Sequence, residues 1–174
     1  MPATHKLIQT ISVATSTQAS IEFTSIPQTF TDLVLFVSCR TDQSSTTSNM
    51  LFQFNGDTAS NYYSRVLWGN GASVTSDYAD PASYVYAGPV FSGSVSSSNL
   101  FGNATIYIPN YTGSASKTSN IEGVTEDNAT TRYVAFSAGR WSGTSAITSI
   151  KVFSGGSANL VQYSSASLYG IKNS

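Results

Sequence analysis

The 174-residue chain is poor in the residue types that build reactive centres, because it contains one Cys and one His. A single Cys excludes an internal disulfide framework and any zinc or iron–sulfur site made from several cysteines. A single His likewise excludes a metal site built from several imidazoles. We therefore expect neither a metal ion nor a cofactor.

Charge and long hydrophobic runs are also scarce. Charged residues make up 10% of the chain, against about 25% in ordinary soluble domains. The formal net charge of −1 does not favour binding to a phosphate backbone, so we expect no nucleic-acid partner. The longest apolar run is Leu33–Val37, far below the roughly 20 residues of a membrane-spanning helix. No signal-like apolar stretch follows Met1–Lys6, and we expect no membrane association.

Hydroxyl and aromatic side chains are abundant instead. Ser and Thr form nearly a third of the chain, and aromatic residues form 12%. Disordered chains are poor in aromatic and β-branched residues, because they cannot bury enough apolar surface to offset the entropy of the chain. The composition therefore predicts a folded protein, and the length predicts a single domain that spans residues 1–174.

Alternating apolar and polar residues indicate strands throughout the sequence, whereas no window sustains the 3.6-residue spacing of a helix. Turn-forming Gly, Asn, Asp and Pro residues separate the strands at short intervals. This rhythm predicts an all-β fold, an antiparallel β-sandwich that is jelly-roll-like. The expected strands are Leu7–Val13, Ser20–Thr24, Leu33–Cys39, Met50–Asn55, Tyr62–Trp68, Ser83–Ala87, Ala104–Ile108, Ser119–Val124, Arg132–Ala138, Ile147–Phe153, Leu160–Tyr163 and Ser167–Ile171.

The pattern also predicts where the chain leaves the sheets. Residues 42–49 and 91–99 are almost entirely polar, so we expect two long surface loops. Asp80–Pro81 and Ala138–Arg140 have the composition of turns. Leu33–Cys39 is apolar on both faces at its start, which indicates an interior strand of a sheet.

Few residues are candidates for chemistry. His5 precedes the first expected strand, where a solvent-exposed side chain is the favoured interpretation. Cys39 has no activating neighbour in the sequence and is expected to be a small buried hydrophobe. The acidic pairs Asp77/Asp80 and Glu126/Asp127 could form a catalytic pair or an oxygen-rich cation site, but acids that cap turns are the simpler interpretation. We therefore expect that the protein is not an enzyme.

The segment Tyr62–Trp68 is the most suggestive of a functional surface. Strand alternation places Tyr62, Val66 and Trp68 on one face, and Tyr63, Arg65 and Leu67 on the other. Two interpretations remain open: a strand buried on both faces, or an aromatic and arginine-rich face presented to a partner, since Tyr, Trp and Arg dominate interaction hot spots. Arg140–Trp141 forms a second candidate of the same kind. The candidate interface residues are therefore Tyr62, Tyr63, Arg65, Trp68, Arg140 and Trp141.

Eight segments of the chain carry a resemblance to a known family. They are Ile21–Leu33, Phe54–Asp57, Ile106–Tyr111, Asn128–Thr130, Ala138–Trp141, Ala146–Lys151, Val161–Tyr163 and Leu168–Ser174. Together they resemble a family of small structural proteins of tailed bacteriophages that infect marine bacteria and cyanobacteria. The resemblance covers most of the chain and implies a component of the virion, produced in the cytoplasm of the bacterial host. It carries no catalytic motif.

These observations predict a capsid decoration (cement) protein that binds the assembled shell. Its partners would be the major capsid protein or other virion proteins. We also expect a homo-oligomer, with a trimer as the expected form. The alternative is a tail or head-fibre module that binds host surface glycan through Trp68, Tyr62 or loop residues.

Overall fold

A computed structural model describes residues 4–96, 98–127 and 132–172. It is almost entirely β-structure, and the single helical element is the short 3-10 turn η1 (Gly155–Ser157). The strands are β1 (His5–Ser12), β2 (Ser20–Phe23), β3 (Asp32–Cys39), β4 (Thr47–Phe54), β5 (Tyr62–Gly69), β6 (Val74–Ala82), β7 (Val85–Ser92), β8 (Gly102–Ile108), β9 (Lys117–Glu126), β10 (Arg132–Trp141), β11 (Ile150–Ser154) and β12 (Ser165–Ile171).

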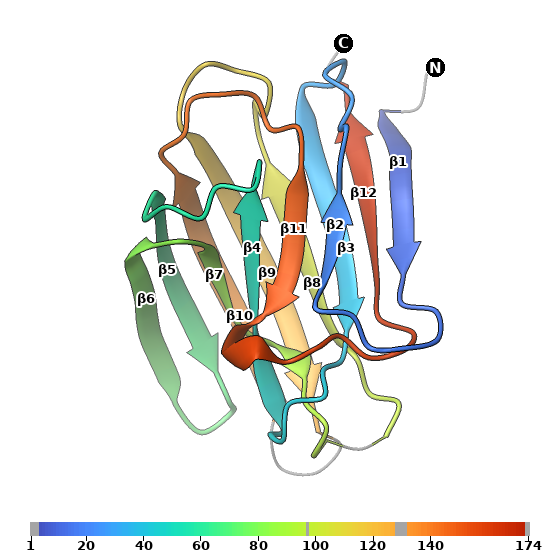
Figure 1. The fold of residues 1–174 in the computed structure, drawn as a ribbon. Helices are drawn as coiled ribbons and strands as arrows, with labels where there is room; N and C mark the ends of the chain where they lie inside the picture. Colours follow the sequence, from blue (N-terminus) through green and yellow to red (C-terminus); the bar gives the residue numbers. More distant parts are fainter. Residues whose placement is uncertain (1–3, 97, 128–131, 173–174) are drawn as a thin grey trace.

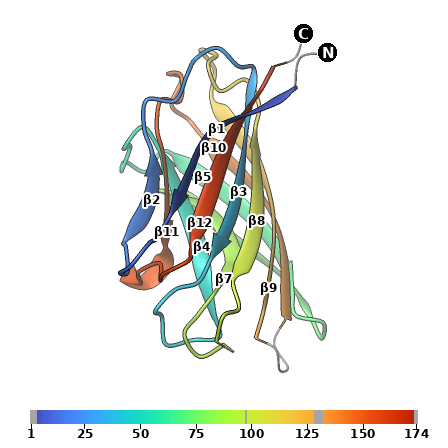
Figure 2. The ribbon, with the colours of Figure 1, turned by 90° about the vertical axis from the view of Figure 1, so that its right-hand side faces the viewer.

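The strands form two antiparallel sheets that pack face to face (Figures 1 and 2). The larger sheet has eight strands in the order β1-β12-β3-β8-β9-β10-β5-β6. The smaller sheet has four strands in the order β2-β11-β4-β7. The predicted all-β antiparallel sandwich is therefore confirmed, and β3 lies in the interior of its sheet as predicted.

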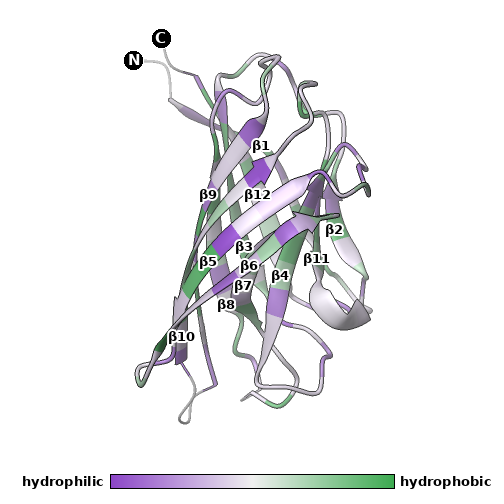
Figure 3. Cartoon of the chain, turned by 90° about the vertical axis from the view of Figure 1, so that its left-hand side faces the viewer, coloured by the Kyte–Doolittle hydropathy of each residue, from purple (hydrophilic) through white to green (hydrophobic). Residues whose placement is uncertain are grey.

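The core lies between the sheets, where each strand turns one set of alternate side chains inward. On β3 these are Leu33, Leu35 and Val37, which are at most 3% exposed. Phenylalanines of the smaller sheet, including Phe52 and Phe54, complete the same cluster. The alternation is visible along the strands in Figure 3, where hydrophobic and hydrophilic residues follow one another. Burial of this apolar surface is the main stabilising term of the fold.

Two glycines allow β7 to approach the larger sheet closely. A Cβ atom on Gly102 would lie 1.9 Å from the carbonyl oxygen of Val90, and one on Gly139 would lie 2.5 Å from Val85 Cγ1. Gly102 begins β8 and Gly139 lies within β10, both strands of the larger sheet. The predicted turn at Ala138–Arg140 is therefore wrong: glycine serves there to make room for a neighbouring strand.

Other boundary predictions were also wrong. β6 was missed, and Asp80–Pro81, expected as a turn, lies within it. The expected strand Leu160–Tyr163 contains only isolated bridges at Leu160. The first expected loop is shorter than predicted because Thr47 begins β4, and the second because β7 continues to Ser92. Within the described residues, no helix is long and apolar enough to cross a membrane.

Candidate functional site

Strand β5 separates the predicted site residues into two groups. Tyr62, Val66 and Trp68 face the core, where Tyr62 is 0% exposed and Val66 1%. Arg65 and Leu67 are exposed on the opposite face, which is the outer face of the larger sheet. The predicted alternation is confirmed, but burial of both faces is wrong. Only the outer side of this strand can meet a partner.

Tyr62 and Trp141 form a structural cluster with Asp57 rather than an interface. The Tyr62 and Trp141 rings stack with centroids 6.4 Å apart. Trp141 Nε1 donates a hydrogen bond of 2.7 Å to Asp57 Oδ2, and the Tyr62 hydroxyl donates to the Asp57 carbonyl at 3.1 Å. Burial raises the pKa of Tyr62 to about 12. Both aromatic residues are thus corrected from surface to core positions.

Trp68 is also directed inward, although it is only half-buried. Its ring contacts that of Tyr133 on β10, with centroids 5.3 Å apart. Its indole Nε1 is buried and has no hydrogen-bond partner among the described residues. Its prediction as an interface residue is therefore not supported by its orientation.

The three remaining candidates, Tyr63, Arg65 and Arg140, meet on the outer face. Arg140 lies over the Tyr63 ring, with its guanidinium carbon 5.1 Å from the ring centroid, and Arg65 lies over Tyr78 at 5.3 Å. Arg65 also forms an ion pair of 2.5 Å with Asp80. Tyr63, Arg65, Asp80 and Arg140 border a shallow depression of about 620 Å³, which we call the arginine hollow. The structure brings together half of the predicted interface set and adds Tyr78 and Asp80.

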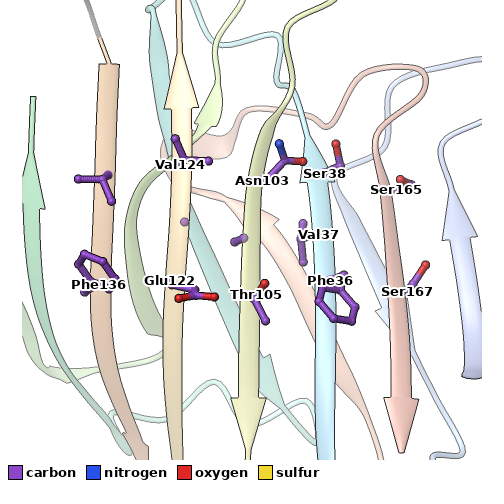
Figure 4. Close-up of a pocket in the computed structure, with 13 residues that line it drawn as sticks. Phe36, Val37, Ser38, Asn103, Thr105, Glu122, Val124, Phe136, Ser165 and Ser167 are labelled. Atoms are coloured by element: carbon purple, nitrogen blue, oxygen red, sulfur yellow. The ribbon is translucent and has the colours of Figure 1, made fainter. Parts of the chain in front are cut away.

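A second depression on the same face was missed by the sequence analysis. Its sides are formed by Phe36 on β3 and by Phe136 and Val134 on β10, and Glu122 and Thr105 lie between them (Figure 4). Its volume is about 440 Å³, within the range of small-molecule sites. We call it the phenylalanine groove. Phe36 and Phe136 are 48% and 56% exposed, which is unusual for phenylalanine.

Strand register explains how residues far apart in sequence build this groove. Phe136 is directly opposite Glu122, Glu122 is opposite Thr105, and Thr105 is opposite Phe36. The row therefore crosses four neighbouring strands, with strands about 4.8 Å apart. Figure 4 shows this row, which continues past Phe36 to Ser167 on the next strand, β12. The alternation of the sequence places Phe36 and Phe136 on the face of their strands that points away from the buried residues. It does not show that this face is exposed in the folded protein.

The residues considered for catalysis or metal binding come from several strands of the larger sheet. His5 is exposed and begins β1, which corrects its predicted place before the first strand. Cys39 is fully buried as predicted, and burial raises the pKa of its thiol to about 12. Glu126 forms a long ion pair of 3.9 Å with Arg132. No group of three metal-ligating side chains occurs in residues 4–96, 98–127 and 132–172.

The arginine hollow is formed by the strands of two hairpins, β5–β6 and β9–β10. The phenylalanine groove shares β9 and β10 with it, but most of its lining comes from β3, β8 and β12. The segment Asn128–Thr130, on which part of the family resemblance rests, lies outside the described residues.

In comparisons with known proteins, no family model, no curated protein and no solved structure matches the chain.

Proposed function

We propose that the protein is a structural component of a bacteriophage virion, a decoration protein that binds the assembled capsid shell. The outer face of the larger sheet carries this proposal. Five large apolar side chains are about half exposed there: Phe36, Leu67, Val124, Val134 and Phe136. A group of this size on one flat surface is typical of a protein contact surface, whereas single exposed apolar residues are ordinary.

The order of the strands supports the same proposal. If the hairpins β5–β6 and β9–β10 are set aside, eight strands remain. These are β1, β2, β3, β4, β7, β8, β11 and β12. Renumbered one to eight in this order, they form one sheet with the strand order 1-8-3-6 and a second with the order 2-7-4-5. We interpret this as a jelly roll with two inserted hairpins. Jelly rolls occur in viral capsid and lectin domains, so this support is an analogy at the level of the fold.

The proposed mechanism depends on contact rather than catalysis. A protein that binds only the assembled shell stabilises that shell by mass action, because its binding free energy is lost on disassembly. Many symmetric copies allow each individual contact to be weak. The two-sheet core makes the outer face a rigid platform, so little conformational entropy is lost when it binds. We assign the protein no enzymatic role in this proposal.

Quantitative mass spectrometry of purified virions tests the proposal. The expected result is a copy number comparable to that of the major capsid protein or a simple fraction of it. A decoration protein must also bind emptied shells that have lost their tails. A handful of copies per particle, or loss of the protein together with the tails, would exclude a decoration role.

The phenylalanine groove favours one alternative, a fibre module that binds host glycan. Two exposed phenyl rings flank hydroxyl and amide side chains, including Thr105 and Asn103. Rings of this kind stack on the apolar faces of sugars, and hydroxyl and amide groups bind sugar hydroxyls. The residues first expected to stack on a sugar, Tyr62 and Trp68, face inward and do not serve this role. A glycan-binding screen with wild-type protein and Phe136→Ser separates the two functions: only the alternative predicts binding that the substitution abolishes.

A further inference from the structure

Among the described residues of four strands, the charges on the outer face of the larger sheet leave one acid and one base without an ion-pair partner. Strands β5, β6, β9 and β10 place six charged side chains there. Four of them form the ion pairs Arg65–Asp80 and Glu126–Arg132. The other two are Glu122 and Arg140, both exposed, and neither forms an ion pair with the described residues.

Each of these two groups lies beside an aromatic ring. Glu122 is directly opposite Phe136 in the phenylalanine groove. Arg140 is directly opposite Tyr63 and stacks on its ring in the arginine hollow. An acid beside a ring forms a binding site for a planar cation, because the carboxylate and the ring face both attract it. The outer face therefore carries both a site for a planar cation, formed by Glu122 and Phe136, and a planar cation, the guanidinium of Arg140.

The two groups are too far apart to meet within one chain. Arg140 on β10 is opposite Thr118 on β9, and Glu122 lies four residues further along β9. At about 3.3 Å per residue this separation is about 13 Å along the strand. A two-fold axis that lies in the plane of the face, near Ala138, exchanges the two positions. It crosses the strands nearly at right angles, so the facing strands of two copies align as in ordinary sheet packing.

We infer that the outer face binds a second copy of this chain, with Arg140 of each copy bound to Glu122 and Phe136 of the other. This is an isologous dimer, in which every contact occurs twice. Tyr63 supports the arginine side chain before binding, which reduces the entropy lost on association. The exposed apolar residues Leu67, Val124 and Val134 surround the two ion pairs and shield them from water, which strengthens them.

This inference concerns association with a second copy and does not depend on the proposed location in a virion. Because the dimer covers the same outer face that the proposed shell contact uses, the two contacts are alternatives for any one copy of the chain. It also differs from the trimer expected from the sequence, because the reciprocal contact closes with two copies. Its partner is chosen by charge complementarity. Among the described residues of β5, β6, β9 and β10, the outer face has one acid, Glu122, and one base, Arg140, without an ion pair, and a second copy satisfies both at once.

Sedimentation velocity over protein concentrations from micromolar to several hundred micromolar tests the inference. The wild type is expected to form a dimer. Glu122→Arg and Arg140→Glu each place like charges opposite one another and should weaken the dimer about tenfold or more. The charge-swapped double variant E122R/R140E restores opposite charges and should recover most of the affinity. Glu22→Arg, a matched charge reversal at an exposed position of β2 in the smaller sheet, should leave the dimer unchanged.

The outcomes are distinct. Rescue by the double variant supports the reciprocal contact, because no effect on folding predicts that two damaging reversals cancel. A protein that remains monomeric throughout, a larger assembly, or a dimer insensitive to both single reversals overturns it. A double variant as weak as the single variants also overturns it. Thermal unfolding of each variant confirms that these exposed substitutions leave the fold intact.

Discussion

The two tryptophans of the chain provide a matched test of what holds the core together. Trp141 is 3% exposed, and its indole donates a hydrogen bond to the Asp57 carboxylate. Trp68 is half-buried, and its indole nitrogen has no partner among the described residues. Replacement by Phe removes the same atoms from both side chains. The two substitutions therefore differ mainly in the hydrogen bond that is lost.

The expected magnitudes follow from these contacts. A hydrogen bond to a charged group contributes about 1.5–3 kcal/mol to stability, and the volume left unfilled beside Trp141 costs about 1 kcal/mol more. Trp141→Phe should therefore lower the free energy of unfolding by about 3 kcal/mol. For a chain of this length that is a fall in Tm of about 6–12 °C. Trp68→Phe should change stability by less than about 1 kcal/mol, because it removes a buried donor that has no acceptor.

The hydrogen bond from Trp141 to Asp57 also predicts how stability depends on pH. Burial raises the pKa of Asp57, but hydrogen bonds from Asn61, Trp141 and Ala59 outweigh it and hold the pKa below its usual value. A carboxyl group with a lowered pKa in the folded state adds stability above its unfolded pKa, and this stability is lost as the pH falls through the folded pKa. Stability should therefore decline below about pH 4, and less steeply in Trp141→Phe.

Denaturant unfolding followed by circular dichroism at neutral and acidic pH measures these differences. The reasoning is refuted if Trp68→Phe destabilises the protein as much as Trp141→Phe. It is also refuted if both variants keep the same dependence on acid as the wild type.

Three further predictions use other contacts. Lys117→Met should cost about 2–4 kcal/mol in denaturant unfolding, because the buried Lys117 amino group donates hydrogen bonds to the carbonyls of Gly113 at 2.7 Å and Ala115 at 2.6 Å; an unchanged midpoint would contradict this role. Gly102→Ala should cost about 3 kcal/mol or more, because its Cβ would overlap the Val90 carbonyl, and a variant of wild-type stability would show that β7 can move away. Cys39 should react with a thiol reagent only after unfolding, because burial raises its pKa to about 12; rapid labelling of the native protein would refute that burial.

The sequence predicted well where burial produces the pattern. Leu33, Leu35 and Val37 alternate with less buried positions because one side of β3 faces the smaller sheet. β6 was missed because it is an edge strand without a buried face, so nothing selects apolar residues at alternate positions. Gly139 suggested a turn because the sequence does not show that Val85 of another strand approaches it.

The candidate site was only partly predictable for a related reason. Residue size and polarity identified Tyr62, Trp68 and Trp141 as important, but the inward direction of a strand depends on where the second sheet lies. Phe36 and Phe136 were missed because side chains alternate along a strand in the same way whether a phenylalanine points outward or toward the core. Their exposure depends on an eight-stranded sheet covered on only one side.

The central claim is that the outer face of the larger sheet works by contact with other proteins. The lone native cysteine is buried, so a Phe136→Cys variant carries a single reactive thiol on that face. Maleimide labelling of this variant should be fast in free protein that is diluted until it is monomeric, and strongly suppressed on assembled particles. Glu22→Cys on the smaller sheet should label rapidly in both states. Equal labelling of Phe136→Cys in the free and assembled states would contradict the claim.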